Sequence, residues 1–400
     1  MAQIKKFVPK KDSPFSTEND ASFEEKIKQH RQKRFLQIVA LIVVAIVVGS
    51  ALYTYLKNLT YNTYIVTSTV EKNMVTGSRY VNYAGNILSY SKDGVFSMDS
   101  KGNSIWNETY EMQNPILRIS GKMVAVADYD GHYVFIMDEH GMKGKIDTNL
   151  PIRDLAVSEN GIIATILEDT RITNINLYNQ EGTMLVTSEL RMQQTGYPMA
   201  LDLSNDGNLL LVSYFGVDGS DVKSSIVFYN YSDVGQNNVD RLVGASDYRD
   251  VVMPVVGFLG KGSAYAVGDK RLSFYSGEEK PVSISEIILE EEILGVYEGD
   301  TSVGLLVGDL QEGNKYRLDV YDGKGNRVAS QKIDMEFKDI IIRNDTILIY
   351  NETQMELFTF SGKEKYNNQF QERINLLIPG SNIRKYTMVT DNSISTIELR

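Results

Sequence analysis

One long uncharged stretch stands out near the start of the chain. Phe35 to Leu56 comprise 22 residues without a charged side chain. A helix rises about 1.5 Å per residue, so this stretch would span about 33 Å, enough for a hydrocarbon core of about 30 Å. Strands rarely reach this length. The pattern therefore predicts a transmembrane helix over residues 35–56.

The charges on either side of this stretch predict its orientation. Residues 1–34 carry nine Lys/Arg and five Asp/Glu, a net charge of +4, whereas the rest of the chain has a net charge of -15. Basic flanks stay in the cytoplasm. We therefore expect residues 1–34 to form a cytoplasmic, largely disordered basic tail, in which residues 23–34 could continue the helix inward. Residues 57–400 are then extracellular. A cleaved signal peptide is the alternative, but its apolar part usually runs only about 7–15 residues.

Beyond residue 60 the pattern changes to short apolar strands separated by polar turns. The recurrent unit is an alternating strand, a turn with Asp or Asn and Gly, and a second strand, as in VFSMDSKGNSIW (95–106) and LDVYDGKGNRVAS (318–330). The units align on the apolar residues Met98, Met137, Tyr178, Tyr229, Tyr275, Tyr321, Phe360 and Ile397. These anchors lie 37 to 51 residues apart, which is the length of one four-stranded blade. The fold class is therefore all-β, a β-propeller.

Eight anchors predict eight blades, and the strand count predicts how the ring closes. The last unit lacks one strand, while TYIVTSTV (63–70) forms a strand just after the predicted membrane helix. Pairing residues 63–70 into the last blade would remove an exposed edge. Seven blades remain an alternative, because insertions at 218–222 and 235–250 blur the period.

The repeat resembles that of known propellers. VFSMDSKGNSIW resembles the unit of quinoprotein-like (PQQ-like) propellers, and the layout of residues 35–400 resembles DUF5711, a family of unknown function with membrane-anchored propellers from Gram-positive bacteria. The resemblance implies the fold and not an activity. A quinone-dependent enzyme would need calcium-binding carboxylates and a catalytic Asp, and no motif for them is found in the sequence. We therefore expect no cofactor and no inherited catalysis.

Composition narrows the chemistry further. The chain has no Cys and a net charge of -11, which excludes thiolate chemistry and argues against nucleic acid as a partner. The histidines are His30, His132 and His140, too few and too scattered for a predicted metal site or a Ser/His/Asp triad. We interpret Glu290–Glu292 as a solvated loop between two blades and Asp322–Asn326 as a turn. No catalytic residue is predicted.

Charged residues on predicted first strands are the candidates for a binding site. The innermost strand of each blade lines the channel of a propeller, so a charge there faces the channel or pairs with a neighbour. The residues in question are Arg118, Arg153, Asp154, Asp202 and Lys338.

These observations favour a binding function. We expect an integral single-span membrane protein with an extracellular, non-enzymatic propeller that acts as a scaffold for an envelope protein or a glycan. Two alternatives remain: a ligand sensor that signals to the cytoplasmic tail, and a carboxylate-dependent enzyme that acts on glycans.

Overall fold

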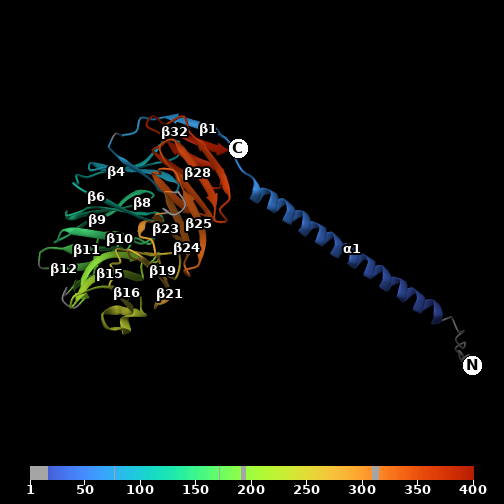
Figure 1. The fold of residues 1–400 in the computed structure, drawn as a ribbon, viewed down its shortest axis with the longest axis horizontal. Helices are drawn as coiled ribbons and strands as arrows, with labels where there is room; N and C mark the ends of the chain where they lie inside the picture. Colours follow the sequence, from blue (N-terminus) through green and yellow to red (C-terminus); the bar gives the residue numbers. More distant parts are fainter. Residues whose placement is uncertain (1–16, 76, 171, 191–194, 309–314) are drawn as a thin grey trace, which may run out of the picture. The chain divides into compact units, whose positions relative to one another are not determined.

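The computed structural model describes residues 17–75, 77–170, 172–190, 195–308 and 315–400. They belong to two compact units, Met1–Leu59 and Thr60–Arg400, which are described separately. The first unit contains the single helix α1 (Thr17–Asn58), and the second contains the strands (Figure 1).

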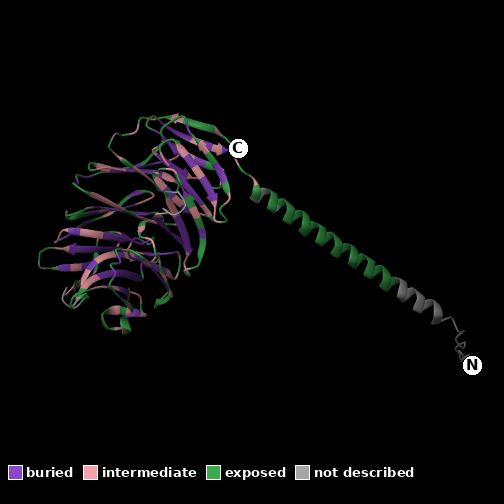
Figure 2. Cartoon of the chain, in the orientation of Figure 1, coloured by how far each residue is buried: buried purple, intermediate pink, exposed green. Residues whose placement is uncertain are grey.

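Helix α1 is longer than the predicted membrane span. Its segment Ile27–Leu52 is long and apolar enough to cross a membrane, with a mean hydropathy of 2.7, and its described side chains are exposed (Figure 2). Residues 23–34 continue the helix, as the sequence suggested, and the helix also includes residues 17–22, for which disorder was expected. Once a helix is nucleated, each added residue gains a hydrogen bond, so the apolar helix can extend into the segment that precedes it. Residues 1–16 of the predicted tail lie outside the described residues.

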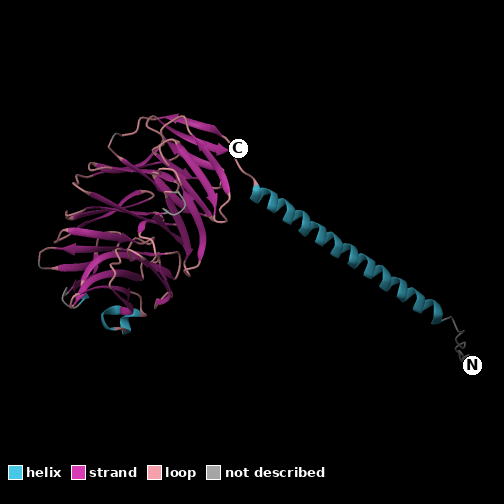
Figure 3. Ribbon diagram, in the orientation of Figure 1, coloured by secondary structure: helices cyan, strands magenta, loops and turns pink. Residues whose placement is uncertain are grey.

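The second unit is an eight-bladed β-propeller, as predicted, and the seven-bladed alternative is excluded. It consists of eight four-stranded antiparallel sheets, so strands dominate it (Figure 3). Two short 3₁₀ helices, η1 (Gly235–Asn237) and η2 (Val239–Arg241), lie in the insertion that follows the third strand of the fourth blade.

Blade 1 consists of β2 (Arg79–Tyr83), β3 (Asn86–Tyr90), β4 (Gly94–Met98) and β5 (Ser104–Thr109), and blade 2 of β6 (Pro115–Ser120), β7 (Met123–Asp128), β8 (Tyr133–Asp138) and β9 (Gly141–Asp147). Blade 3 consists of β10 (Ile152–Val157), β11 (Ile163–Glu168), β12 (Thr173–Tyr178) and β13 (Met184–Leu190), and blade 4 of β14 (Tyr197–Leu203), β15 (Leu209–Asp218), β16 (Asp221–Asn230) and β17 (Leu242–Arg249). The strands of blades 5 to 8 are β18 (Val255–Phe258), β19 (Ser263–Val267), β20 (Arg271–Ser276) and β21 (Val282–Ile288); β22 (Ile293–Glu298), β23 (Ser302–Gly308), β24 (Tyr316–Asp322) and β25 (Arg327–Ile333); β26 (Asp339–Arg343), β27 (Thr346–Tyr350), β28 (Gln354–Thr359) and β29 (Glu364–Gln369); β30 (Leu376–Pro379), β31 (Lys385–Val389), β32 (Ser393–Leu399) and β1 (Tyr64–Glu71).

Blade 8 joins the two ends of the propeller, as the sequence predicted. Its order is β30-β31-β32-β1, so the first strand of the propeller is the outermost strand of its last blade. The pairing is antiparallel and runs from Tyr64 opposite Leu399 to Glu71 opposite Ser393. In Figure 1 the blue β1 lies beside the red β32. Ring closure therefore depends on main-chain hydrogen bonds between segments more than 300 residues apart in the sequence.

The hydrophobic core lies between the blades. Each of eight clusters of buried side chains joins two adjacent blades, including the cluster in which Ile87 and Met98 of blade 1 pack against Leu376 and Val389 of blade 8. Central strands are therefore buried on both faces, which explains continuous apolar runs such as residues 123–127.

The turn between the third and fourth strands repeats with the same hydrogen bonds. The Asp99 carboxylate accepts the N–H groups of Lys101 and Asn103 at 2.8 and 2.9 Å, and Asp322 accepts the equivalent pair at 2.9 Å. Gly102 and Gly325 have φ values of 74° and 83°, which disfavour any residue with a Cβ. Asp322–Asn326 is thus a turn, as predicted.

The closure can be tested by cross-linking β1 to β32. Thr69 lies opposite Ser395, and their hydroxyl oxygens are 3.0 Å apart. Because the chain has no Cys, the double variant T69C/S395C should form one disulfide on oxidation. The disulfide should also raise the free energy of unfolding of the propeller by about 2–4 kcal/mol, since it closes a very long loop. Mass spectrometry and thermal unfolding measure both effects.

The matched control is T63C/S395C, which moves one thiol from Thr69 to residue 63, just before β1. It should stay reduced, because residue 63 lies opposite the chain end near Arg400. Equal disulfide formation in the two variants would contradict the register.

Candidate binding site in the central channel

The first strands of the blades surround the central channel. Neighbouring first strands such as β10 and β14, and β22 and β26, lie against each other around the ring. At the end where they turn into the second strands, the channel opens into a cavity of about 970 Å³, here called the channel mouth. Each blade in turn contributes to its lining through Asn82, Ile119, Glu159, Asn205, Phe258, Glu298, Ile341 and Ile378.

Three of the five predicted residues come together in the channel. The Arg118 guanidinium on β6 donates to the Asp154 carboxylate on β10 at 2.7 Å. Asp202 on β14 accepts the backbone N–H of Phe258 at 2.8 Å. The charges of Arg118 and Asp154 both act on the pKa of Asp202. Strands from three neighbouring blades thus bring two carboxylates and one guanidinium into a single group.

Glu298, the last residue of β22, completes this group. Its side chain lines the channel mouth and reaches solvent, but the channel wall surrounds it. Loss of hydration, together with the nearby Asp202 charge, raises the pKa of Glu298 to about 8. Burial also raises the pKa of Asp202 to about 6, although the Phe258 N–H opposes this rise. Of the two carboxyl groups, Glu298 therefore holds its proton to the higher pH.

Aromatic packing completes the wall near these carboxyl groups. Gly257 lies opposite Tyr265 in the β18–β19 pair, and a Cβ at Gly257 would lie 2.6 Å from the Tyr265 ring. The absence of a side chain at residue 257 thus makes room for that ring. Burial and the charges of Glu298 and Asp202 raise the pKa of Tyr265.

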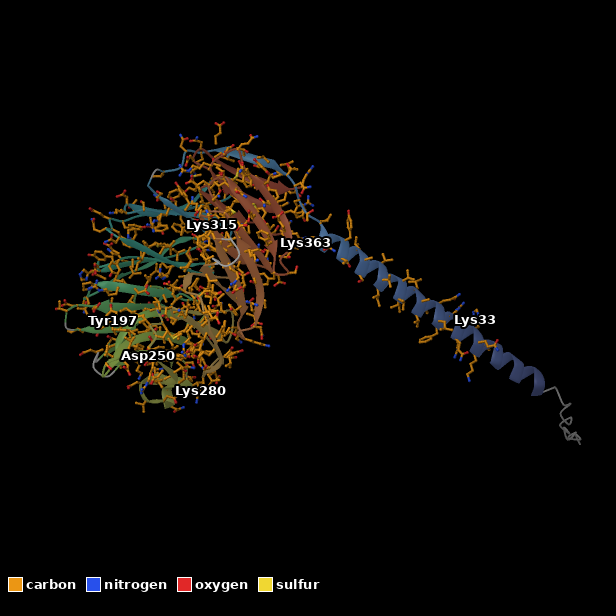
Figure 4. All side chains as sticks on the ribbon, viewed as in Figure 1. Lys33, Tyr197, Asp250, Lys280, Lys315 and Lys363 are labelled. Atoms are coloured by element: carbon orange, nitrogen blue, oxygen red, sulfur yellow. The ribbon has the colours of Figure 1, made fainter. Side chains whose placement is uncertain are left out.

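Arg153 does not belong to the channel group. The pairing of β10 with β11 skips this residue, so it is the extra residue of a β-bulge, which can redirect a side chain. Its guanidinium binds the Glu168 carboxylate at 3.0 Å and also pairs with Asp130. Tyr197, labelled in Figure 4, donates its hydroxyl to the same Glu168 carboxylate at 2.9 Å. Arg153 therefore joins blades 2, 3 and 4 through ion pairs and hydrogen bonds.

Lys338 also differs from the prediction, because it precedes β26 rather than lying on it. Its ammonium group donates to the carbonyl oxygens of Asn375 at 2.8 Å and Ile374 at 3.4 Å. Burial lowers the pKa of Lys338. The residue links blade 7 to blade 8.

The other candidate groups remain separate from the channel. Glu290–Glu292 follow β21 in a loop between blades, as predicted, but Glu291 is bound to Arg317 at 3.0 Å. His132 binds the Thr148 carbonyl at 2.9 Å, while His140 is exposed. Among the residues that the structure describes, no group of three or more His, Asp or Glu side chains is placed to hold a metal ion.

Sequence reasoning missed Glu298. The acidic run Glu290–Glu292 drew attention to the loop, although Glu298 ends an apolar first strand, ILGVYE, and precedes a Gly-Asp pair. Asp202 lies similarly near the end of ALDLS. Aligning the ends of the first strands across units would have placed both carboxylates on one rim.

The raised carboxyl pKa values predict an unusual pH dependence of stability. The folded chain holds protons on Glu298 and Asp202 that the unfolded chain releases near their ordinary values of 4.5 and 3.8. Stability contributed by these groups is therefore present at low pH and is lost as pH rises toward about 8. The melting temperature of E298Q minus that of wild type should therefore increase by about 2 °C from pH 5 to pH 8.5. The increase is small because channel water screens the charge.

Fluorescence of Trp106, the only Trp in the sequence, can follow this unfolding. The control E290Q removes an exposed loop carboxylate and should not change the pH dependence. If the melting temperatures of wild type and E298Q changed with pH in parallel, the raised pKa of Glu298 would be contradicted.

Three solved structures are similar to this chain at low sequence identity. BamB from Moraxella catarrhalis is 11% identical, with a TM-score of 0.47 over 84% of this chain and 100% of that one. Apo AztD from Citrobacter koseri is 10% identical, with a TM-score of 0.50 over 74% of this chain and 87% of that one. Hsv2p from Kluyveromyces lactis is 10% identical, with a TM-score of 0.49 over 74% of this chain and 98% of that one. At these identities the likeness concerns the fold alone. No curated protein sequence matches the chain.

A family model gives a more specific result. The model described as "Family of unknown function (DUF5711)" matches residues 57–399. The match covers the propeller and leaves out most of α1. The chain therefore belongs to the DUF5711 family.

Proposed function

We propose that this chain is a membrane-anchored, extracellular binding module whose channel mouth docks a basic segment of an envelope protein. The observation that carries the proposal is the channel mouth itself, a cavity of about 970 Å³ to which all eight blades contribute. A ring closed by main-chain pairing holds such a surface in one geometry before a partner arrives, which lowers the entropic cost of binding.

The charge of the channel mouth favours a basic partner. No hydrogen bond or ion pair with another described residue is found for the carboxylates of Glu298 and Asp300, which both line it. Its cation Arg343 is engaged with the Pro379 carbonyl at 3.1 Å, and Glu159 accepts from Asn205 at 2.8 Å. A Lys or Arg side chain of a partner would pair with the Asp300 carboxylate. It would also favour the ionised form of Glu298, whose pKa burial raises to about 8.

A basic peptide tests this docking surface. Hexalysine labelled with a fluorophore should bind the full-length protein in uncharged detergent, and added salt should weaken the binding. At pH 8.5, above the Glu298 pKa of about 8, E298Q/D300N should weaken the binding about tenfold, since two charge-assisted contacts are lost. Fluorescence anisotropy measures the affinity.

The double variant E290Q/E292Q is the matched control, because it removes the same charge from the loop between blades 5 and 6. It should leave the affinity unchanged. Equal losses in the two double variants would point to non-specific attraction to an acidic surface and would contradict docking at the channel mouth.

Helix α1 supports the membrane anchor and its orientation. Ile27–Leu52 is long and apolar enough to span a bilayer, and the excess of basic residues precedes it. The positive-inside rule then places the N-terminus in the cytoplasm and the propeller outside. The length of the apolar segment favours an uncleaved anchor over a signal peptide.

Single cysteines can measure the orientation in intact cells, since the chain has none of its own. S361C, on an exposed turn of blade 7, should react with a membrane-impermeant maleimide, and S16C should react only after the membrane is permeabilised. Labelling of S16C alone in intact cells would reverse the topology.

A carboxylate-dependent enzyme acting on glycans is a second candidate, favoured by one observation. Burial raises the pKa of Asp202 to about 6 and that of Glu298 to about 8, so of these two neighbouring carboxyl groups Glu298 holds its proton more strongly. Such a pair can supply a base and an acid. A polysaccharide product that wild type releases, and that both D202N and E298Q fail to release, would favour this candidate over the binding module.

A further inference from the structure

A second cavity, here called the rim pocket, lies between blades 1 and 2 at the opposite ends of their first strands from the channel mouth. Its volume is about 600 Å³, within the range of about 300–1,000 Å³ that is usual for small-ligand sites. Arg79 begins β2 and lies opposite Tyr90, the last residue of β3. Both line the pocket, together with Lys92, Gln113, Asn114 and Tyr129.

The rim pocket is basic within an acidic domain. The chain beyond residue 34 carries a net charge of -15, and most of its cations are engaged, as Arg118, Arg153 and Arg317 are. In contrast, neither the Arg79 guanidinium nor the Lys92 ammonium group has a hydrogen bond or ion pair with another described residue. Two unengaged cations in one concave site favour an anionic ligand.

The backbone around these cations is already ordered. Asp128 accepts the N–H groups of Gln113 at 3.0 Å and Asn114 at 2.7 Å. Its carboxylate is thereby turned toward the main chain. The Lys92 carbonyl accepts the N–H of Met112 at 2.8 Å. The walls are thus held by main-chain contacts, while the amide side chains of Gln113 and Asn114 stay available as donors and acceptors.

Tyrosine rings provide the apolar part of the pocket. Tyr129 is 40% exposed, and the Arg153 guanidinium lies 5.7 Å from its ring centre, which helps to hold it in place. Tyr90 is half-buried on the blade 1 side. Ring faces beside amide groups suit a saccharide, whose C–H face is apolar and whose hydroxyl groups need donors and acceptors.

We propose that the rim pocket binds an acidic saccharide, with Arg79 and Lys92 on its carboxylate or phosphate, Gln113 and Asn114 on its hydroxyl groups, and the tyrosine rings against a sugar face. This site goes beyond the docking of a basic segment, because it has the opposite charge and uses the opposite ends of the first strands. A propeller with both sites could connect a basic protein to an acidic glycan.

Titration of the full-length protein in uncharged detergent tests the proposal. The probes are a uronic-acid trisaccharide, a phosphorylated trisaccharide, their neutral counterpart, inorganic phosphate, and vesicles containing phosphatidylglycerol. One or both acidic trisaccharides should bind at least tenfold more tightly than the neutral trisaccharide and than inorganic phosphate. R79Q/K92Q should bind the acidic trisaccharides more weakly than wild type, by about tenfold for each cationic side chain that is removed.

The control K101Q/K324Q removes the same charge from two turns between third and fourth strands and should bind as wild type does. Unchanged Trp106 emission in R79Q/K92Q would show that blade 1 keeps its fold. The proposal is contradicted if neither acidic trisaccharide binds, if R79Q/K92Q and the control lose affinity equally, or if phosphate or the vesicles bind as tightly as the saccharides. Hexalysine binding should be retained in R79Q/K92Q, so a failure here is distinguishable from a failure at the channel mouth.

Discussion

The antiparallel pairing of β1 with β32 is the constraint on which the propeller depends. Without β1, blade 8 would have three strands and the free edge of β32 would be exposed. Residues 378–381 of this blade belong to the channel mouth, so the binding surface depends on a strand from the other end of the chain. Only residues 59–63 separate that strand from α1. The segment that follows the apolar helix is therefore also the segment that closes the ring.

Most of the fold could be predicted from the sequence, because every blade repeats one chemical pattern. In seven blades the fourth strand carries one extra residue, a β-bulge, opposite the end of the third strand. In six of these blades the third-strand residue at the bulge is the aligned anchor, from Met98 to Tyr321. In blade 7 the corresponding third-strand residue is Phe358, two residues before the predicted anchor Phe360. Thr359 takes the place of Asp there, and its hydroxyl accepts the Lys363 N–H at 3.2 Å. The side-chain hydrogen bond of the turn is thus kept in blade 7, but the usual Asp is absent. The sequence alignment of the repeats, which relied on that residue, was therefore displaced by two residues.

The site was less predictable than the fold, because a strand assignment does not say which way a side chain points. Arg118, Asp154 and Asp202 do meet in the channel, but a bulge turns Arg153 toward Glu168. Lys338 binds carbonyl groups of the neighbouring blade instead. Glu298 completes the group from a blade that is far away in the sequence, and no local pattern marks that proximity. Irregular pairing and contacts between distant blades therefore limit what periodicity alone can reveal.

Carboxylates at one end of the first strands and unengaged cations at the other give the propeller two chemically different faces. The acidic channel mouth is the surface that an envelope protein should contact. Site-specific photo-cross-linking in living cells tests this directly, with the reactive amino acid at Asn205, which lines the mouth, or at Val328, on the outermost strand β25 of blade 6. A reproducible protein adduct from position 205 that is absent from position 328 is the expected result. Adducts from position 328 alone, equal adducts from both positions, or none from position 205 would contradict a docking site at the channel mouth.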